Sequence, residues 1–187
     1  HRLLKGATFC AKLLFMDDTQ WLSQREQEAW VRFAAVLELL PSALDTQLSK
    51  DSDLTHFDYF CLSTLSETPT RILLTSELAA RTNATLPRLS RVLTKLEKRE
   101  YITRTPCKRD RRATEVALTE AGWNKVVASA PGHATEVRRL VVDALEPKEI
   151  DQLANISAKL LSRLDPEQRV IASSPLYRRQ QPDTGKD

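Results

Sequence analysis

Positive charge is concentrated in one short part of this sequence. Between Arg81 and Arg112 there are eleven lysines and arginines and three acidic residues, a net charge of +8. The whole chain carries +3, so the other 155 residues together carry −5. Within the basic segment, apolar residues first recur at helical spacing and then alternate as they do in β-strands. A basic helix followed directly by a basic hairpin is the charge pattern expected of a surface that meets a polyanion.

The composition predicts a fold built mainly of helices. Only four of the 187 residues are glycine, against a usual frequency of about 7%, and leucine, alanine, glutamate and arginine are abundant. The length suits one domain with a small dimerisation lobe. No run of residues approaches the roughly eighteen uncharged apolar positions that a membrane-spanning helix needs.

Apolar periodicity and turn residues divide the chain into its expected elements. Capping boxes at 23–26 and 55–58 open two helices, and Pro41 and Pro131 should kink the helices that contain them. The expected middle elements are a strand over 71–74, helices over 75–81 and 85–99, and strands over 101–105 and 114–118. This order is a winged helix-turn-helix, so we predict a mainly α fold with a small β-wing.

The first and last helices are more apolar than one small domain requires. The stripe that follows Thr119 keeps helical spacing as far as Leu145, and a further helix starts at Pro147. Long amphipathic helices of this kind often pack on a second copy of the chain. We therefore assign residues 20–53 and 123–164 to dimerisation helices, and residues 54–122 to the winged helix-turn-helix domain.

The two ends of the chain differ in composition from this central part. Residues 165–187 are polar and contain proline, which predicts a disordered tail. Residues 1–15 hold three lysines and arginines and no acidic residue. We expect these first residues to be an extension that precedes a native start at Met16. The alternative is a basic arm that contacts nucleic acid.

One side of the helix over 85–99 is apolar and the opposite side is basic. At about 100° per residue, four leucines share one arc: Leu86, Leu89, Leu93 and Leu96. Four cations lie opposite: Arg88, Arg91, Lys95 and Lys98. In a DNA major groove, such a helix would pair arginine with guanine and lysine with phosphate. A solvated surface face is the alternative, which the adjoining basic hairpin makes less favoured. The residues predicted to contact DNA here are Thr85, Arg88, Ser90, Arg91 and Lys95.

The tip of the hairpin packs four cations into one turn. Such cations repel one another unless an anion relieves them, and the minor groove of DNA has the strongest phosphate potential. We expect Asp110 to hold an arginine side chain in a set geometry through a charge-assisted hydrogen bond, with Arg112 as the preferred partner. The alternative is that Asp110 is a plain turn residue. The predicted wing contacts are Lys108, Arg109, Asp110, Arg111 and Arg112.

Several motifs together resemble the MarR family of transcriptional regulators, from about Trp21 to Leu164. They are Leu78-Ala79, Leu89-Ser90-Arg91-Val92-Leu93, and Asp110-Arg111-Arg112 followed by Leu118-Thr119-Glu120-Ala121-Gly122. The resemblance implies a homodimer joined by its first and last helices, bound to double-stranded DNA at a palindromic operator. It also implies a repressor released by a small phenolic or otherwise lipophilic effector, or by oxidation. Two positions depart from the pattern, because Glu100 and Ala113 stand where the family commonly has glycine.

The resemblance also implies an effector cleft between the dimer lobe and the DNA-binding lobe. The candidates for its lining are Trp30, Phe33, His56, Phe57, Tyr59 and Phe60. The alternative is that most of these side chains are simply core. Cys61 is expected to be a small buried core residue, whereas Cys107, beside Lys108 and Arg109, is the candidate for a reactive thiol.

No arrangement of residues in the sequence indicates catalysis, a metal or a cofactor. The cysteines at 10, 61 and 107 and the histidines at 1, 56 and 133 are too far apart for a standard zinc motif or a disulfide framework. We therefore expect a reducing, cytoplasmic location. No catalytic triad or glycine-rich phosphate loop is visible, so we predict that the protein is not an enzyme. The alternative to a sequence-specific regulator is a winged-helix protein that binds nucleic acid without sequence preference.

Overall fold

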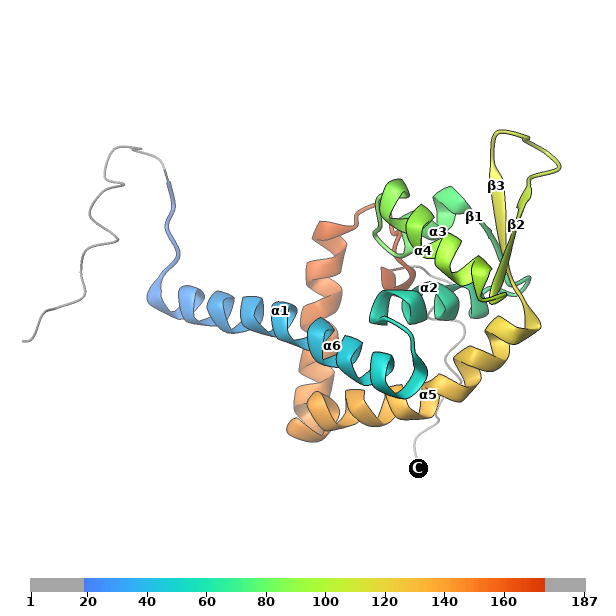
Figure 1. Ribbon diagram of the computed structural model, residues 1–187. Coiled ribbons are helices and arrows are strands. Elements are labelled where there is room, and N and C mark those ends of the chain that lie inside the picture. Colours follow the sequence, from blue (N-terminus) through green and yellow to red (C-terminus); the bar gives the residue numbers. More distant parts are fainter. Residues whose placement is uncertain (1–18, 174–187) are drawn as a thin grey trace, which may run out of the picture. The chain divides into compact units, whose positions relative to one another are not determined.

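The computed structural model describes residues 19–173 (Figure 1). Its elements are α1 (Gln24–Ser52), α2 (His56–Ser66), β1 (Ile72–Leu74), α3 (Thr75–Arg81), α4 (Leu86–Lys98), β2 (Ile102–Pro106), β3 (Thr114–Leu118), α5 (Glu120–Leu140), η1 (Val142–Ala144), α6 (Pro147–Leu164) and η2 (Ile171–Ser173). The predicted fold class, mainly helical with a small β-wing, is confirmed. The expectations for residues 1–15, for Met16 and for residues 174–187 lie outside the described residues. Among those described, no helix is long and apolar enough to cross a membrane.

The described part of the chain divides into two compact units, residues 19–39 and 40–173, with the boundary inside α1. The helix itself continues through Pro41 and ends at Ser52. The whole winged helix-turn-helix lies in the second unit.

Both predicted capping boxes form. The Glu26 carboxylate accepts the Ser23 N–H at 2.7 Å, while the Ser23 hydroxyl lies 3.4 Å from the Glu26 nitrogen. At the start of α2, the Thr55 hydroxyl accepts the Asp58 N–H at 3.0 Å, and the Asp58 carboxylate accepts the Thr55 N–H at 2.9 Å. Each box satisfies backbone donors that a helix N-terminus otherwise leaves unpaired. These caps fix where α1 and α2 begin.

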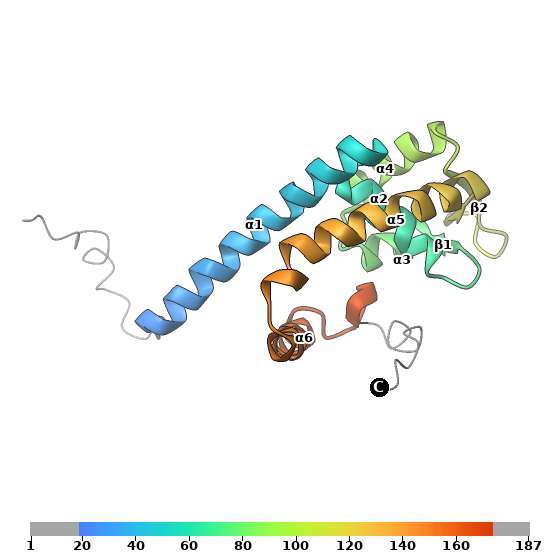
Figure 2. The same cartoon turned by 90° about the horizontal axis from the view of Figure 1, so that it is seen from below.

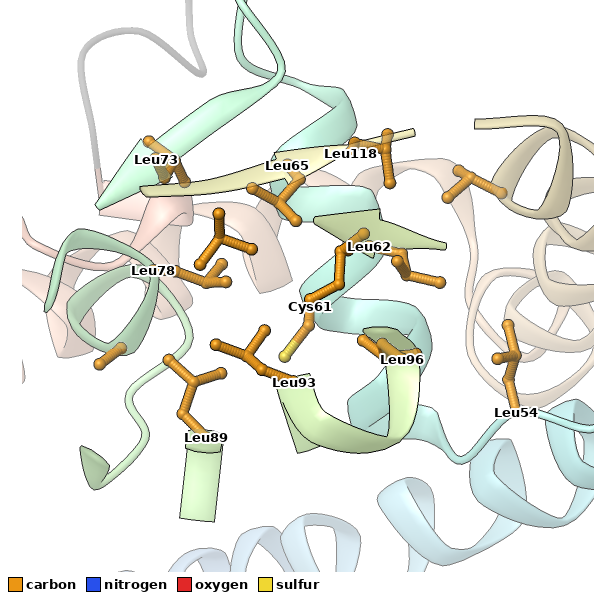
Figure 3. Close-up of a cluster of buried hydrophobic side chains, with 14 residues drawn as sticks. Leu54, Cys61, Leu62, Leu65, Leu73, Leu78, Leu89, Leu93, Leu96 and Leu118 are labelled. Carbon is orange, nitrogen blue, oxygen red and sulfur yellow. The ribbon is translucent and has the colours of Figure 1, made fainter. Parts of the chain in front are cut away.

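The sheet has three antiparallel strands in the order β1-β3-β2. In its central strand, Ala117 is paired with Ile72 on one side and Thr103 on the other. Buried side chains from α2, α3, α4 and the sheet form one apolar cluster (Figure 3). Helix α5 packs against α2 at the edge of this cluster (Figure 2). The hairpin of β2 and β3 projects away from the helices (Figure 1).

Helices α3 and α4 are joined by a tight turn at residues 82–84. Asn83 has φ 49°, in the left-handed region that asparagine tolerates better than most residues. The Asn83 N–H donates to the Ala80 carbonyl at 3.2 Å, and the Ala84 N–H donates to the Ala79 carbonyl at 2.9 Å. This pair of bonds is a Schellman motif, which ends α3 and turns the chain toward α4.

The apolar side of α4 anchors it in the core. Leu89, Leu93 and Leu96 are at most 1% exposed, as the helical spacing predicted. Leu86 does not belong with them, because its side chain is 56% exposed in the first turn of the helix. The predicted apolar arc is therefore correct for three leucines and wrong for the fourth, which precedes the part of α4 that the core covers.

The chain departs from prediction in two places near its C-terminal end. Helix α5 continues through Pro131 but ends at Leu140, not at Leu145, and η1 follows. Val141 leaves the helical region, with φ −125° and ψ −61°, while its N–H still donates to the Val137 carbonyl. Residues 165–173 are also not the disordered segment that we expected. The buried Asp165 carboxylate accepts two backbone N–H groups, of Arg169 and Val170, each at 2.9 Å.

Candidate nucleic-acid interface

The outward side of α4 carries the side chains that the sequence singled out for DNA. Thr85 is the N-cap residue, and its hydroxyl makes no capping hydrogen bond. Ser90, Arg91 and Lys98 are exposed. Among the ion pairs of residues 19–173, none involves Arg91 or Lys98. These two cations are therefore available to a ligand in solution.

The other two cations predicted on this side lie against α2. The Lys95 ammonium forms an ion pair with the Asp58 carboxylate at 2.5 Å. The Arg88 guanidinium lies over the Phe57 ring, 4.1 Å from its centroid. Arg88 and Lys95 are both exposed on this side of α4, as predicted, but each also contacts a side chain of α2, which the sequence did not indicate. Helical spacing places a side chain on one face of a helix, but it does not show a partner that lies 37 residues away in the sequence.

The end of α4 has a defined geometry although glycine is absent. Glu100 has φ 60° and lies in the left-handed region. Its N–H donates to the Glu97 carbonyl at 2.9 Å, and the Tyr101 N–H donates to the Leu96 carbonyl at 3.0 Å. These bonds form a second Schellman motif. Glu100 therefore adopts the conformation for which the family pattern has glycine, and α4 ends at Lys98.

The wing loop presents four exposed cations: Lys108, Arg109, Arg111 and Arg112. Within the described part of the chain, none of them is in an ion pair. Asp110 accepts the main-chain N–H of Arg112 at 2.9 Å and, among the described residues, pairs with no guanidinium, so it is the turn residue given as the alternative and does not hold an arginine side chain. A short carboxylate side chain reaches the N–H two residues ahead, which is the geometry of an Asx turn. The Arg112 guanidinium has no ion-pair partner among residues 19–173.

A salt bridge that the sequence reasoning missed joins the wing to α4. The Arg104 guanidinium on β2 donates to the Glu97 carboxylate through Nε at 3.0 Å and through Nη2 at 2.5 Å, and lies 3.3 Å from the Thr94 hydroxyl. These hydrogen bonds hold the pKa of Glu97 below its usual value. Glu97 is the only acidic residue in α4. A single acid on an otherwise basic helix was the sequence signal that could have indicated an ion-pair partner.

The candidate effector residues fall in both units. His56 and Tyr59 lie beside His133 of α5, with ring centroids 6.1 Å and 4.7 Å from its ring. Burial lowers the pKa of both histidines, opposed at His56 by Asp45 and reinforced at His133 by His56. Burial likewise raises the pKa of Tyr59. Phe60 is half-buried on the same helix. In the other unit, Trp30 and Phe33 are 56% and 41% exposed. The effector cleft stays a prediction.

The two described cysteines are both buried and free. Cys61 has no exposed surface, and burial raises the pKa of its thiol to about 12, so it is the core residue that we predicted. Cys107 is 8% exposed, at the base of the wing loop. Sensing of oxidation by Cys107 stays a prediction.

Comparison with known proteins identifies the family. A model described as MarR family matches residues 54–114. The solved structure of Sco3205, a MarR family transcriptional regulator from Streptomyces coelicolor in complex with DNA, is 34% identical, covering 81% of this chain and 94% of that chain with a TM-score of 0.76. The chain belongs to the MarR family. Membership points to a transcriptional regulator and not to an enzyme.

Two further comparisons agree with this membership. The MarR-family regulator AbsC from Streptomyces coelicolor is 34% identical to this MarR-family chain, covering 78% of this chain and 98% of that chain with a TM-score of 0.73. The transcriptional repressor MprA from Escherichia coli is 34% identical over 107 residues. That alignment covers 57% of this chain and 60% of MprA, so the match spans less than two thirds of this curated relative.

Proposed function

We infer that this MarR-family protein is a DNA-binding transcriptional repressor that acts as a homodimer on a palindromic operator. The observation that carries this proposal is the set of exposed cations without ion-pair partners among the described residues. They lie on α4, at Arg91 and Lys98, and on the wing, from Lys108 to Arg112. Exposed like charges at this density favour contact with phosphates.

Each part of the basic surface has a distinct role in the proposal. Helix α4 enters the major groove, where Arg91 pairs with guanine, and Thr85 and Ser90 contact base edges or phosphates. The wing enters the adjacent minor groove with Arg109, Arg111 and Arg112. Sco3205 was solved in complex with DNA, and MprA is a repressor. Both observations support DNA binding and repression by the present protein.

The dimer is supported by apolar side chains that a single chain leaves in water. Trp30, Leu37 and Leu39 on α1 are 52–70% exposed, and Ile156 and Leu164 on α6 are 56% and 80% exposed. Apolar surface of this extent marks an interaction site. Isologous pairing of α1 and α6 with the same helices of a second copy would bury this apolar surface. It would also place the two copies of α4 on one duplex, about one helical turn apart. A small lipophilic effector would act from the residues around His56 and Tyr59.

Selection of bound duplexes from a random pool, at physiological salt, tests the proposal. We expect a two-fold symmetric motif with half-sites about one helical turn apart. Arg91→Ala should weaken binding to that motif by roughly 1–3 kcal/mol and relax the preference at one position of each half-site. Enrichment without any motif, or an equal loss on selected and random DNA, would instead indicate binding without sequence preference.

A further inference from the structure

The first turn of α2 contacts three different elements through three consecutive residues. The His56 N–H donates to the Asp45 carboxylate of α1 at 2.8 Å, and its ring faces His133 of α5. Phe57 lies under the Arg88 guanidinium of α4. Asp58 forms the ion pair with Lys95 of α4. This turn therefore connects the basic side of α4 to the rest of the domain.

Asp58 is the most buried charged group in this arrangement. Its side chain is 2% exposed, whereas that of Lys95 is 47% exposed, and among the described residues the Asp58 carboxylate accepts the Thr55 N–H and the Lys95 ammonium alone. A carboxylate out of contact with water is stabilised only when it is paired and hydrogen-bonded. If Lys95 swung outward to a DNA phosphate, it would leave the Asp58 charge buried beside a single amide donor. The ion pair therefore holds Lys95 against α2.

Two more cations attach α4 along the same edge: Arg88, which lies over the Phe57 ring, and Arg99. The Arg99 guanidinium pairs with the Asp53 carboxylate at 2.7 Å and donates to the Asp53 carbonyl at 2.6 Å. At about 100° per residue, Arg88, Lys95 and Arg99 lie within about 40° of one another around the helix. Arg91 and Lys98 lie on the neighbouring edge. The basic side of α4 thus consists of an inner edge whose cations contact the domain and an outer edge whose cations make no ion pair within residues 19–173.

We propose that Asp58 is a positioning residue for DNA recognition, which sets the rotation of α4 through Lys95, and that Lys95 contacts no phosphate. This inference rests on the proposed function. A bidentate contact between Arg91 and guanine depends on the angle at which α4 presents the side chain. Contacts to phosphates depend on it much less, because they use charge with little directionality. Loss of the ion pair should therefore reduce specific binding more than non-specific binding.

The salt dependence of binding distinguishes a positioning role from a phosphate contact. Each phosphate contact contributes about 0.9 to the slope of log K against log salt. We expect Lys95→Met to leave the slope unchanged, while the ratio of affinities for the selected operator and for a random duplex falls at least several-fold. The matched control is Lys98→Met on the outer edge of the same helix, where the slope should fall and the ratio should not. A slope that falls equally in both variants would overturn the proposal.

A double-mutant cycle in denaturant tests the ion pair without DNA. Asp58→Asn keeps an acceptor for the Thr55 N–H but removes the charge. We expect each single variant to lower the unfolding midpoint, and the double variant Asp58→Asn, Lys95→Met to lower it less than the sum. If the effects on the unfolding midpoint were additive while the unsubstituted protein still bound DNA, the positioning role of Asp58 would be overturned and the proposed function would stand. Failure of the unsubstituted protein to bind any duplex would overturn the proposed function as well.

Discussion

Gly122 lies directly against the backbone of Tyr101. A Cβ atom at position 122 would be 2.1 Å from the Tyr101 carbonyl oxygen and 2.7 Å from a Leu118 methyl group. The N-cap residue Thr119 fixes the same corner, because its hydroxyl accepts the Gly122 N–H at 3.0 Å and donates to the Glu100 carbonyl at 2.7 Å. The Leu-Thr-x-x-Gly motif therefore allows the N-terminus of α5 to pack closely against the residues that join α4 to β2.

Gly122→Ala should destabilise the protein by roughly 1–3 kcal/mol, because the carbonyl that the new methyl group meets belongs to the backbone and has no free rotation. Urea unfolding followed by circular dichroism would measure this. Gly132→Ala is a matched control, since among the described residues its Cβ would meet the ends of two side chains and no backbone atom, with Gln47 Nε2 at 3.2 Å and Asp51 Oδ2 at 3.9 Å. Equal losses in the two variants would contradict this explanation of the motif.

Glu100→Gly should stabilise the protein by about 0.5–1 kcal/mol. A left-handed conformation costs a residue with a Cβ about 1–2 kcal/mol, which glycine avoids. Part of this gain is offset because glycine loses more conformational entropy on folding. The expected result is a rise in melting temperature of a few degrees. Lys98→Gly, two residues earlier and inside α4, should instead destabilise the protein by about 1 kcal/mol, because glycine is a poor helix former. A lower melting temperature for Glu100→Gly would show that the side chain itself stabilises the end of the helix.

Asp110→Ala should weaken operator binding by about 0.5–1.5 kcal/mol, the usual net contribution of one hydrogen bond, because the wing loop loses the acceptor for the Arg112 N–H. Asp110→Asn keeps an acceptor at the same place and should bind at least as well as the unsubstituted protein. Fluorescence anisotropy with the selected operator would compare them. If the asparagine variant binds as weakly as the alanine variant, the charge of Asp110 matters and its turn geometry does not.

Acidification should destabilise the fold through His56 and His133. Their pKa values are lowered from 6.5 in the folded state, chiefly by burial, so the unfolded chain binds more protons as the pH falls. The stability that the neutral rings contribute is present above pH 6.5 and is lost as the pH falls through the folded-state pKa. Unfolding free energies measured between pH 7.5 and 5.5 should therefore decrease.

The variant His56→Gln, His133→Gln is the control for this pH dependence. It should show a flatter profile over the same range, because glutamine does not titrate. The neighbouring Tyr59 does not contribute in this window, because burial raises its pKa further above the usual value of about 10. An identical decrease in the double variant would assign the effect to other groups.

The sequence was sufficient to predict nearly all of the winged helix-turn-helix. Periodicity placed α3 and both strands of the hairpin within one residue, and the capping boxes marked the starts of α1 and α2. These features are local, since they depend on residues three or four apart or on alternation along a strand. The burial of Leu89, Leu93 and Leu96 follows from the same spacing.

The features that sequence reasoning missed depend on pairs far apart in the chain or on single caps. The ion pair of Lys95 with Asp58 joins residues 37 positions apart, so a helical wheel shows Lys95 only as another exposed cation. Asp110 was expected to hold the Arg112 side chain, but it takes the role given as the alternative, that of a turn residue, because composition does not distinguish a main-chain donor from a guanidinium. At residues 165–173 a polar composition suggested disorder, and one buried carboxylate with two N–H donors sufficed to order the chain.

The salt bridge between Arg104 and Glu97 has a consequence for the geometry of the operator. Because β2 of the hairpin is joined to the C-terminal half of α4 by this salt bridge, the distance between the two elements proposed to contact DNA, α4 and the wing, is fixed. If one base pair were inserted between the bases contacted by α4 and those contacted by the wing loop, the two elements could not both reach their bases. Tolerance for such spacing changes should therefore be narrow within a half-site.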